Sequence, residues 1–510
     1  MMTTPRRLVL KSAAAATLAA AVRPALAQAT PMIDLRIDAT RPARAVNPMV
    51  LGNNLDWTNK GQGLYTDASL QHPPGWLDLA DRLSPTALRF PGGTNADFFH
   101  WKTGLGRVSE RGRSRTLERK DEAVLLGTDE FLAFCKRWKS EPLITVNVAT
   151  GSADEAAQWL RYTNKRATDL PRVRYWEIGN EPYLDASAPE TQMNPAEFAR
   201  RVNLIIRAMK AVDPEIEFGV PLRTDTLGGV DATPFKGFNE AVLKGVTEPF
   251  EWAALHSSYY PVTFTKSESP AELFGATMAA TRVLQADIEA TRTALRSHYP
   301  RRTMRLAFTE YNALYSLDIL RYGIAAVFLS KTDRYIESMA GALYVADALR
   351  IFSLTDDLLM ANFWALNGNW WFGAISHEFK PRPQFHVLEA WRDLISGNLL
   401  PVEVKTPMMA TGKAGFVPAF ADTEQVSAHA LLQGSTVRAA VINRHPQQAA
   451  LLRIGVIGVL RGTVQIRELT SDHYFGTPVR WVERQVDLRD GRAEFTLSKH
   501  SFAVLTFKPR

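Results

Sequence analysis

Two glutamates follow apolar runs at the points where buried strands would end. Glu181 comes after the run 173–178 and the pair Gly179-Asn180, and Glu310 comes after the run 304–309. Cleavage of a glycosidic bond needs a protonated carboxylic acid at the leaving oxygen and a carboxylate at the anomeric carbon. Two facing glutamates supply both groups, and a retaining enzyme holds them about 5–5.5 Å apart. We therefore expect Glu181 to be the general acid/base and Glu310 the nucleophile.

A second Asn-Glu pair shows what the same dipeptide looks like without a catalytic role. Asn239-Glu240 lies at the start of a helical pattern between apolar residues, which is typical of a surface helix turn. Asn180-Glu181 follows a strand instead, and polar residues just beyond strand ends carry the chemistry in barrels of parallel strands. The contrast favours a catalytic role for Glu181.

Three more polar side chains end or follow strand-like runs. Arg89 stands at the end of one run, where its guanidinium would keep a nucleophilic carboxylate ionised; the alternative is an ion pair that only caps the core. His256 ends another run, and Tyr259 follows it in a polar turn. We expect His256 to orient the nucleophile or a sugar hydroxyl, although a lone histidine is more often structural. Tyr259 is a candidate substrate contact.

Aromatic and amide side chains follow the last expected strand. Trp364, Asn367, Trp370 and Trp371 all lie there. Large apolar rings at a barrel mouth can stack on the apolar faces of sugars, and the alternative is that these rings pack against a neighbouring domain. We expect Trp364 and Asn367 to contact substrate.

The elements that must position these side chains alternate along the chain. Short apolar runs are separated by longer amphipathic segments between residues 48 and 396, which indicates repeated strand-helix units and a parallel sheet. Eight strands are expected, at 49–54, 87–90, 142–148, 173–178, 216–220, 251–256, 304–309 and 359–365. No nucleotide-binding glycine pattern follows the first strand, so a (β/α)8 TIM barrel is favoured over an open α/β sheet.

After the segment expected to form the barrel, the hydrophobic pattern of the sequence changes. From about Gly397 short alternating runs are separated by turn residues, which predicts a C-terminal antiparallel β-sandwich. Residues 32–39 alternate in the same way and precede the barrel. The expected domains are therefore a strand in 30–46 that joins the sandwich, the catalytic barrel in 47–396 and the β-sandwich in 397–510.

The first residues resemble an export signal. Arg6-Arg7 precede an alanine-rich apolar stretch and a small-residue cleavage site at Ala25-Leu26-Ala27. The paired arginines favour a twin-arginine-type signal over residues 1–29 and a periplasmic or secreted protein. A membrane anchor is the weaker alternative, because the apolar stretch is shorter than the ~20 residues that a span needs.

Composition excludes several classes of function. The formal charge is +7, and the leader carries four of the positive side chains, which leaves too little excess charge to indicate nucleic-acid binding. Hydrophobic residues make up 46%, as in globular enzymes and unlike disordered chains. Cys135 is the only cysteine and falls in a helical pattern, so it is expected to be a small core residue. No motif indicates a metal, a nucleotide or another cofactor, and no run after the leader is long enough for a membrane span.

A highly charged insertion occupies residues 102–127. It is expected to be a solvated loop. Because it follows the second strand, on the face where barrel active sites lie, a second possibility is that it shapes the substrate cleft.

At these residues the chain resembles clan A of the glycoside hydrolases, and most closely the α-L-arabinofuranosidases of family 51. The matching segments fall in the family's order and cover roughly residues 48–400. They are 88–93, 99–102, 130–135, 141–147, 179–181 and 255–256. The resemblance implies a barrel with a C-terminal β-sandwich, the acid/base role for Glu181 and the nucleophile role for Glu310.

The resemblance also implies sugar contacts. It assigns them to Asp56, Arg89, Asn180 and His256. Three positions depart from the family pattern: Asp56 stands where glutamate is usual, Thr94 stands where asparagine is usual, and Tyr311-Asn312 follow Glu310 in place of a tryptophan.

The expected function is a cofactor-free retaining glycoside hydrolase that acts by double displacement on an oligo- or polysaccharide. The resemblance favours an exo-acting, α-L-arabinofuranosidase-like enzyme on plant or bacterial glycans. The alternatives are an endo-acting enzyme, a hydrolase of β-xylosides, glucuronides or exopolysaccharides from the same clan, a transglycosylase, or a non-catalytic carbohydrate-binding protein. No nucleic-acid partner is expected, nor any membrane contact after removal of the signal.

Overall fold

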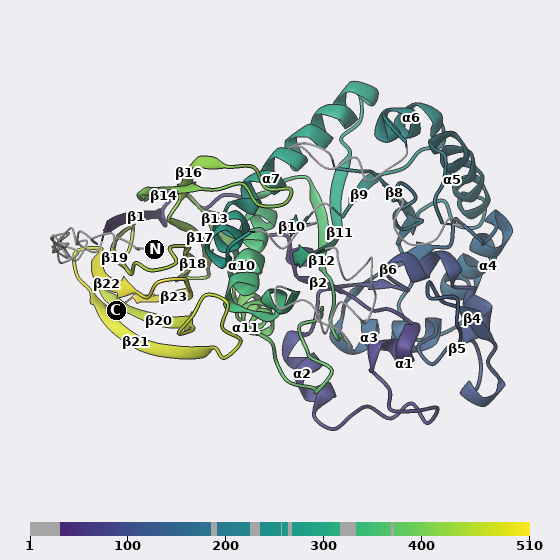
Figure 1. Cartoon of the computed structure of the whole chain (residues 1–510), viewed down its shortest axis with the longest axis horizontal. Helices are drawn as coiled ribbons and strands as arrows, with labels where there is room; N and C mark the ends of the chain where they lie inside the picture. Colours follow the sequence, from purple (N-terminus) through teal and green to yellow (C-terminus); the bar gives the residue numbers. More distant parts are fainter. Residues whose placement is uncertain are drawn as a thin grey trace, which may run out of the picture.

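The computed structural model describes most of the chain as two packed bodies. The described residues are 31–184, 191–224, 235–256, 258–263, 268–316, 333–368 and 372–509. A barrel of strands ringed by helices forms one body, and layered β-sheets form the other (Figure 1). The leader, and with it the predicted export signal, lies outside the described residues.

Eight strands of the described residues close into a parallel barrel, as the sequence predicted. They are β2 (Gly52–Asn54), β3 (Ala87–Phe90), β6 (Glu141–Val146), β7 (Tyr175–Ile178), β8 (Glu217–Pro221), β9 (Trp252–Leu255), β11 (Arg305–Ser316) and β12 (Leu358–Phe363). Pairing of β9 with β11 closes the ring. A further strand, β10 (Ser258–Thr263), follows β9 in the chain and pairs with the C-terminal half of β11. Strands β3, β7, β9 and β12 are buried along their whole length, because helices cover the outside and side chains fill the inside.

The first strand is shorter than predicted. Residues Pro48–Leu51 form the 3-10 helix η1, in which Asn47 accepts a hydrogen bond from the backbone N–H of Met49. Pro48 has no N–H to give to a strand ladder, and its fixed φ suits the start of a helix. The strand itself therefore begins at Gly52.

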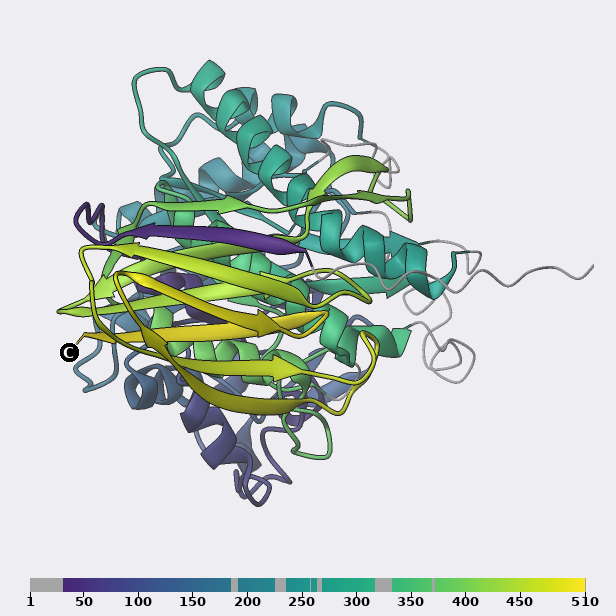
Figure 2. The ribbon, with the colours of Figure 1, turned by 90° about the vertical axis from the view of Figure 1, so that its left-hand side faces the viewer.

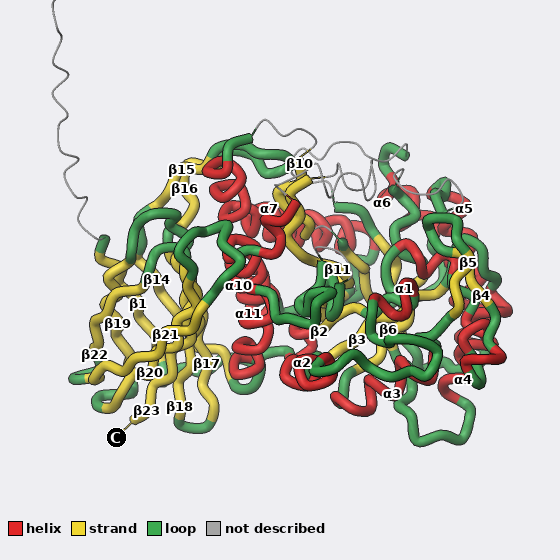
Figure 3. The backbone as a smooth tube through the Cα atoms, turned by 60° about the horizontal axis from the view of Figure 1, so that its bottom comes forward, coloured by secondary structure: helices red, strands yellow, loops and turns green. Residues whose placement is uncertain are grey.

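Helices surround the barrel on its outer side (Figures 1 and 3). They are α1 (Thr58–Gln62), α2 (Trp76–Leu83), α3 (Thr128–Trp138), α4 (Ala153–Asn164), α5 (Pro195–Lys210), α6 (Phe238–Gly245), α7 (Pro270–His298), α10 (Met339–Leu354) and α11 (Pro383–Trp391). Asn239-Glu240 lies in the first turn of α6, as predicted, and Cys135 is buried in α3. Within the described residues, none of the helices is long and apolar enough to cross a bilayer.

Two helix starts show how the sequence sets the element boundaries. Asn194 caps α5 by accepting from the backbone N–H of Ala196, with Pro195 in the first turn. Ser152 caps α4 by accepting from the N–H of Glu155. The Glu155 carboxylate does not return this bond in a capping box, because it pairs with His100 at 3.0 Å.

The second body contains two main sheets that face each other across an apolar core (Figure 2). One sheet has the order β14-β1-β19-β22 and the other the order β13-β17-β18-β23-β20-β21. Their bounds are β1 (Met32–Asp38), β13 (Asn398–Leu400), β14 (Val402–Lys405), β17 (Val426–Gln433), β18 (Thr436–Asn443), β19 (Ala450–Ile457), β20 (Gly462–Thr470), β21 (Arg480–Leu488), β22 (Arg492–Leu497) and β23 (Ser501–Pro509). The hairpin β15 (Met408–Thr411) and β16 (Phe420–Glu424) stands apart and packs on α7.

The N-terminal strand β1 lies inside this second body. It pairs antiparallel with β14 and parallel with β19, so one pairing departs from a wholly antiparallel sandwich. Its alternating pattern buries Ile33, Leu35 and Ile37 in the sandwich core and leaves the residues between them exposed.

A buried ion cluster joins the two bodies. Helices α10 and α11 stand between the barrel strands and the sandwich (Figures 1 and 3). Asp347 of α10 pairs with Arg350 at 2.7 Å and with Arg444 of the sandwich at 2.5 Å, and Ser427 donates a hydrogen bond to it. Burial alone would raise the pKa of Asp347, but the two guanidinium groups hold it well below its usual range.

Candidate active site

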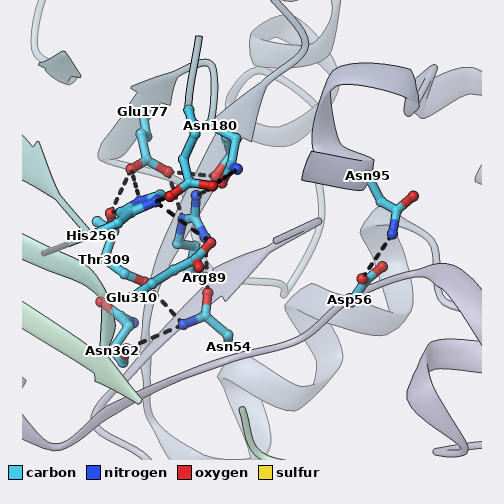
Figure 4. A network of polar contacts seen from close by, with 12 residues as sticks. Asn54, Asp56, Arg89, Asn95, Glu177, Asn180, His256, Thr309, Glu310 and Asn362 are labelled. Carbon is cyan, nitrogen blue, oxygen red and sulfur yellow. Dashed lines mark hydrogen bonds and ion pairs between the residues drawn. The ribbon is translucent and has the colours of Figure 1, made fainter. Parts of the chain in front are cut away.

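The side chains singled out in the sequence meet at the carboxyl ends of the barrel strands. Arg89 comes from β3, Glu181 from the turn after β7, His256 from the position after β9 and Glu310 from β11. Figure 4 shows Arg89, Asn180, His256 and Glu310 in one network of polar contacts. Arg89 and Glu310 are 221 residues apart in the chain and still form a direct ion pair, as the barrel topology predicts.

Arg89 is the centre of this network. Its side chain is fully buried, and its three nitrogen atoms donate to four acceptors. Nε donates to Glu177 Oε2 at 2.6 Å and Nη2 to Asn180 Oδ1 at 2.7 Å. Nη1 donates to Glu310 Oε1 at 2.7 Å and to Asn54 Oδ1 at 3.2 Å. A guanidinium held in this way fixes the position of the Glu310 carboxylate.

Glu177 is the second buried charge, and sequence reasoning missed it. Its side chain has no exposed surface, and Oε2 accepts from Arg89 Nε and from the Thr145 hydroxyl at 2.7 Å. Oε1 accepts from the Thr309 hydroxyl at 2.7 Å. Burial alone would raise the pKa of Glu177, but the Arg89 charge, with help from His256, lowers it to about 2.

His256 connects Glu177 to the two predicted catalytic glutamates. Its Nε2 lies 2.8 Å from the Thr309 hydroxyl oxygen. Its Nδ1 lies 3.1 Å from Glu181 Oε1 and 3.9 Å from Glu310 Oε1. Burial would lower the pKa of His256, but the Glu310 charge and contacts with Glu177 and Glu181 raise it to about 10. The surrounding carboxylates therefore favour the imidazolium form of His256, which is an electrostatic partner for both glutamates.

Glu181 and Glu310 both lie near His256 Nδ1, with one oxygen of each at 3.1 Å and 3.9 Å. These two oxygens are therefore no more than about 7 Å apart, which admits the spacing of about 5–5.5 Å in retaining glycosidases. The Glu181 side chain is 17% exposed and that of Glu310 is 7% exposed, whereas Glu177 is not exposed at all. Only the first two can reach a substrate. Asn180 donates a weak hydrogen bond to Glu181 Oε2 at 3.4 Å.

Asp56 lies to one side of this network. It accepts from the backbone and hydroxyl of Thr58 and, at 3.3 Å, from Asn95 Nδ2 (Figure 4). Burial raises its pKa to about 7. Asn95 also accepts from the backbone N–H of Leu117, in the charged insertion 102–127. Most charged side chains of the insertion are exposed, as predicted, and Leu117 links it to Asn95 beside Asp56. It contains the hairpin β4 (Arg113–Arg115) and β5 (Asp121–Ala123).

Trp364 lies against a pair of glycines at the barrel mouth. A Cβ on Gly93 would stand 2.7 Å from Trp364 Cη2, and a Cβ on Gly92 would stand 3.2 Å from Cζ3. The ring is half-buried, so one part packs on this glycine turn and another part is accessible. The side-chain amide of Asn312, on β11, donates a hydrogen bond to the carbonyl oxygen of Trp364 at 2.6 Å. This bond holds the backbone of Trp364 against β11.

The remaining residues that were predicted to contact substrate are Asn367, with a role seen in the structure, and Tyr259, whose side chain is not described. Asn367 is buried, and its side-chain amide donates to the carbonyl oxygen of Gln62 at 2.5 Å, so in this structure it anchors a loop. The backbone of Tyr259 lies in β10, but its side chain falls outside the described residues. Trp370 and Trp371 also fall outside them.

Sequence reasoning missed Glu177, Thr309, Asn54 and Asn95. Glu177 did carry a signal: it is an acid inside an otherwise apolar strand, and a buried charge requires a partner. Thr309 precedes Glu310, and its hydroxyl joins two strands that are not adjacent in the sequence. Asn54 and Asn95 act through side-chain bonds to residues far along the chain, which no local pattern reveals.

We expect Gly93→Ala to disturb the site through Trp364. Gly93 has φ 61° and ψ −171°, a conformation open essentially only to glycine, so alanine should cost about 1–3 kcal/mol of unfolding free energy. The added methyl group would also displace the Trp364 ring and lower activity. The matched control is Gly75→Ala, which has φ 75° but no neighbour within 4 Å. Equal losses of activity in both variants, measured beside their unfolding midpoints, would contradict a role for the ring.

Comparison with known proteins agrees with the site. The family model described as the alpha-L-arabinofuranosidase 1 domain matches residues 79–225. Alpha-L-arabinofuranosidase C of Emericella nidulans is 31% identical over 28% of this chain and 30% of its own length. An intracellular exo-alpha-(1->5)-L-arabinofuranosidase of Streptomyces lividans is 27% identical over 44% of this chain and 37% of its own length. The chain thus matches only about a third of the length of these relatives.

The fold agrees over almost the whole chain. The crystal structure of an alpha-L-arabinofuranosidase from Thermotoga maritima superposes with a TM-score of 0.75 at 20% identity, covering 93% of this chain and 99% of that one. The barrel and the sandwich are therefore the fold of these solved structures, and the glutamates after β7 and on β11 lie at the carboxyl ends of its strands. The chain resembles the family 51 α-L-arabinofuranosidases of clan A, which confirms the resemblance read from the sequence.

Proposed function

We propose that this protein hydrolyses glycosidic bonds with retention of the anomeric configuration, and that Glu181 and Glu310 carry the reaction. The observation that supports this most directly is their placement. Both carboxylates reach the barrel mouth beside one buried histidine, and Arg89 holds Glu310 in position. A protonated acid and an ionised nucleophile at that spacing are what double displacement requires.

The reaction takes two steps. First, a Glu310 carboxylate oxygen attacks the anomeric carbon while Glu181 gives its proton to the departing oxygen, so that a glycosyl ester replaces the glycosidic bond. In the second step Glu181 takes a proton from water, and the hydroxide adds to the anomeric carbon and releases Glu310. The Arg89 guanidinium favours the second step, because it stabilises the carboxylate that leaves.

The proposed substrate is an α-L-arabinofuranoside, removed by exo action from a plant or bacterial glycan. The names of the relatives and the family match over residues 79–225 support this choice. Asp56 bears on it, because this carboxyl group lies beside the site where the family resemblance implies a sugar contact. Endo action, or a β-xyloside, glucuronide or exopolysaccharide substrate, would use the same two glutamates.

A panel of aryl glycosides, led by the α-L-arabinofuranoside and the β-D-xyloside, tests the function. We expect wild type to cleave the arabinofuranoside and to release the sugar first as the retained anomer by NMR. Glu181→Ala should slow substrates with poor leaving groups by about 10²–10⁴-fold and substrates with activated leaving groups much less, since only the former need the proton.

The matched control is Glu240→Ala, which removes a glutamate from the same dipeptide on the surface of α6. It should leave every rate unchanged. An inverted product would refute the mechanism, and cleavage of only the β-D-xyloside would refute the sugar. If no aryl glycoside is cleaved but a polysaccharide is, the enzyme acts in the endo mode and not in the exo mode. If glycans bind and none is cleaved, the protein is a carbohydrate-binding protein.

The predicted export signal is also part of the proposal. The Arg6-Arg7 pair and the apolar stretch after it support delivery to the periplasm or the medium, with a mature chain that starts near Gln28.

A further inference from the structure

We propose that Glu177 is a positioning residue that, through Thr309, holds His256 as an imidazolium whose Nδ1 faces Glu181 and Glu310. This inference rests on the proposed function, because it takes Glu181 and Glu310 as the reacting groups. Glu177 cannot contact a substrate, since its side chain has no exposed surface. Its influence must therefore pass through the groups that touch it.

The polar groups that contact Glu177 in the described part of the chain are hydrogen-bond donors. Arg89 Nε, the Thr145 hydroxyl and the Thr309 hydroxyl donate to it at 2.6, 2.7 and 2.7 Å, and His256 Nε2 lies 3.6 Å from Oε1. A carboxyl group surrounded by donors is held ionised. The site therefore contains a permanent negative charge that no substrate meets.

The Thr309 hydroxyl transmits this charge to His256. A hydroxyl has one hydrogen, and in this geometry Thr309 gives it to Glu177 Oε1. Its oxygen must then accept from His256 at 2.8 Å, so the ring carries hydrogen on Nε2. The other nitrogen, Nδ1, faces Glu181 at 3.1 Å and Glu310 at 3.9 Å. Glu177 thus fixes which edge of the ring meets the reacting glutamates.

The Glu177 charge offsets positive charge at the centre of the cluster. Its carboxylate lies against Arg89 and 3.6 Å from His256 Nε2. Without this charge the two cations would lose a carboxylate partner in a desolvated site, which is costly in a medium of low polarity. The cluster would relieve the excess positive charge by losing a proton from His256, at a lower pH than in wild type.

Other titratable groups face this cluster and must be accounted for. They are Arg89 from β3, Asp97 from η2 (Thr94–Phe98), Glu181 and Tyr183 from the turn after β7, Arg223 after β8, His256 after β9 and Glu310 from β11. Burial raises the pKa of Asp97 to about 7, so this carboxyl group also titrates near neutral pH. Within the described residues it forms no hydrogen bond or ion pair with His256 or Glu181, and the NMR signals of the His256 ring would not report its titration directly.

The test is Glu177→Gln, which keeps the shape of the side chain and removes its charge. We expect the alkaline limb of kcat/KM to move down by about one pH unit or more. KM should change little, because Glu177 does not touch substrate. Glu177→Asp retains the charge and should recover most of the wild-type profile.

The matched control is Asp347→Asn. This residue is also a buried carboxylate paired with two arginines, but it lies in the joint between barrel and sandwich. The substitution should lower the unfolding midpoint while leaving the pH limb unchanged. A purely structural role of Glu177 would give the same outcome for Glu177→Gln, and would overturn the proposal.

NMR of the histidine rings gives a readout that needs no turnover. The His256 signals are assigned by their loss in His256→Gln, and wild type should show both ring N–H protons at about pH 8, with Glu177→Gln losing one of them. A neutral His256 ring in wild type at that pH overturns the proposal even if Glu177→Gln fails to fold. An imidazolium that depends on Glu177 in a protein that cleaves no glycoside would uphold the charge balance and refute the proposed function instead.

Discussion

Replacing Glu310 with alanine is expected to lower kcat by at least about 10⁴-fold on every glycoside that wild type cleaves. The reason is that no other carboxylate can take over the attack. Glu181 has the acid/base role in the proposed mechanism, and the buried Glu177 side chain cannot reach a substrate. The measurement is steady-state turnover of the arabinofuranoside, beside the unfolding midpoint of the variant.

Azide provides the internal control for this variant. Removal of the Glu310 side chain leaves Arg89 Nη1 without its 2.7 Å carboxylate partner, so a small anion has a cation to bind in the space left behind. Added azide should therefore restore turnover of an activated aryl glycoside and yield a glycosyl azide of inverted configuration. Residual activity above about one per cent, or rescue with retention, would remove Glu310 from the nucleophile role.

Arg89→Met should be the most destabilising substitution in the site. It leaves Glu177 and Glu310 as buried carboxylates without their shared cation, which costs about 3–5 kcal/mol when one partner of a buried ion pair is lost. Activity should fall as well, because Glu310 loses its fixed position. Chemical denaturation and turnover are measured on the same preparation.

Arg444→Met separates the two effects. Arg444 is also a buried arginine, paired with Asp347 at the joint of the two bodies. We expect a comparable shift of the denaturation midpoint but no change in the kcat of the folded protein. If Arg89→Met kept the stability and the turnover of wild type, the conclusion that Arg89 holds Glu177 and Glu310 in position would be wrong.

The fold was predictable because burial leaves a plain pattern in the sequence. Strands covered on both faces appear as continuous apolar runs, and this alone located the eight barrel strands. Glu181 and Glu310 could be found because both follow such runs. The alternation at Ile33, Leu35 and Ile37 indicated that β1 belongs with the sandwich.

The parts that sequence did not reveal depend on partners distant in the chain. Glu177 looks like one acid in an apolar run until Arg89, Thr145 and Thr309 are placed around it. Asn367 follows the last strand in the manner of a substrate contact, yet its amide is bonded to a backbone carbonyl. Spacing along the chain shows where a side chain starts, and only the folded barrel shows which groups it meets.

The pairing of β1 imposes an order on how the molecule is completed. This strand leaves the ribosome before the barrel, but its partners β14 and β19 are made only after the barrel, so Ile33, Leu35 and Ile37 wait unpaired during most of synthesis. Contacts of such long sequence separation form late and slowly. Because the sheet order is β14-β1-β19-β22, a nascent chain that stops short of residue 450 has only β14 and β1 of this sheet. One edge of β1 therefore stays without its strand partner until the barrel and the first part of the sandwich have been made.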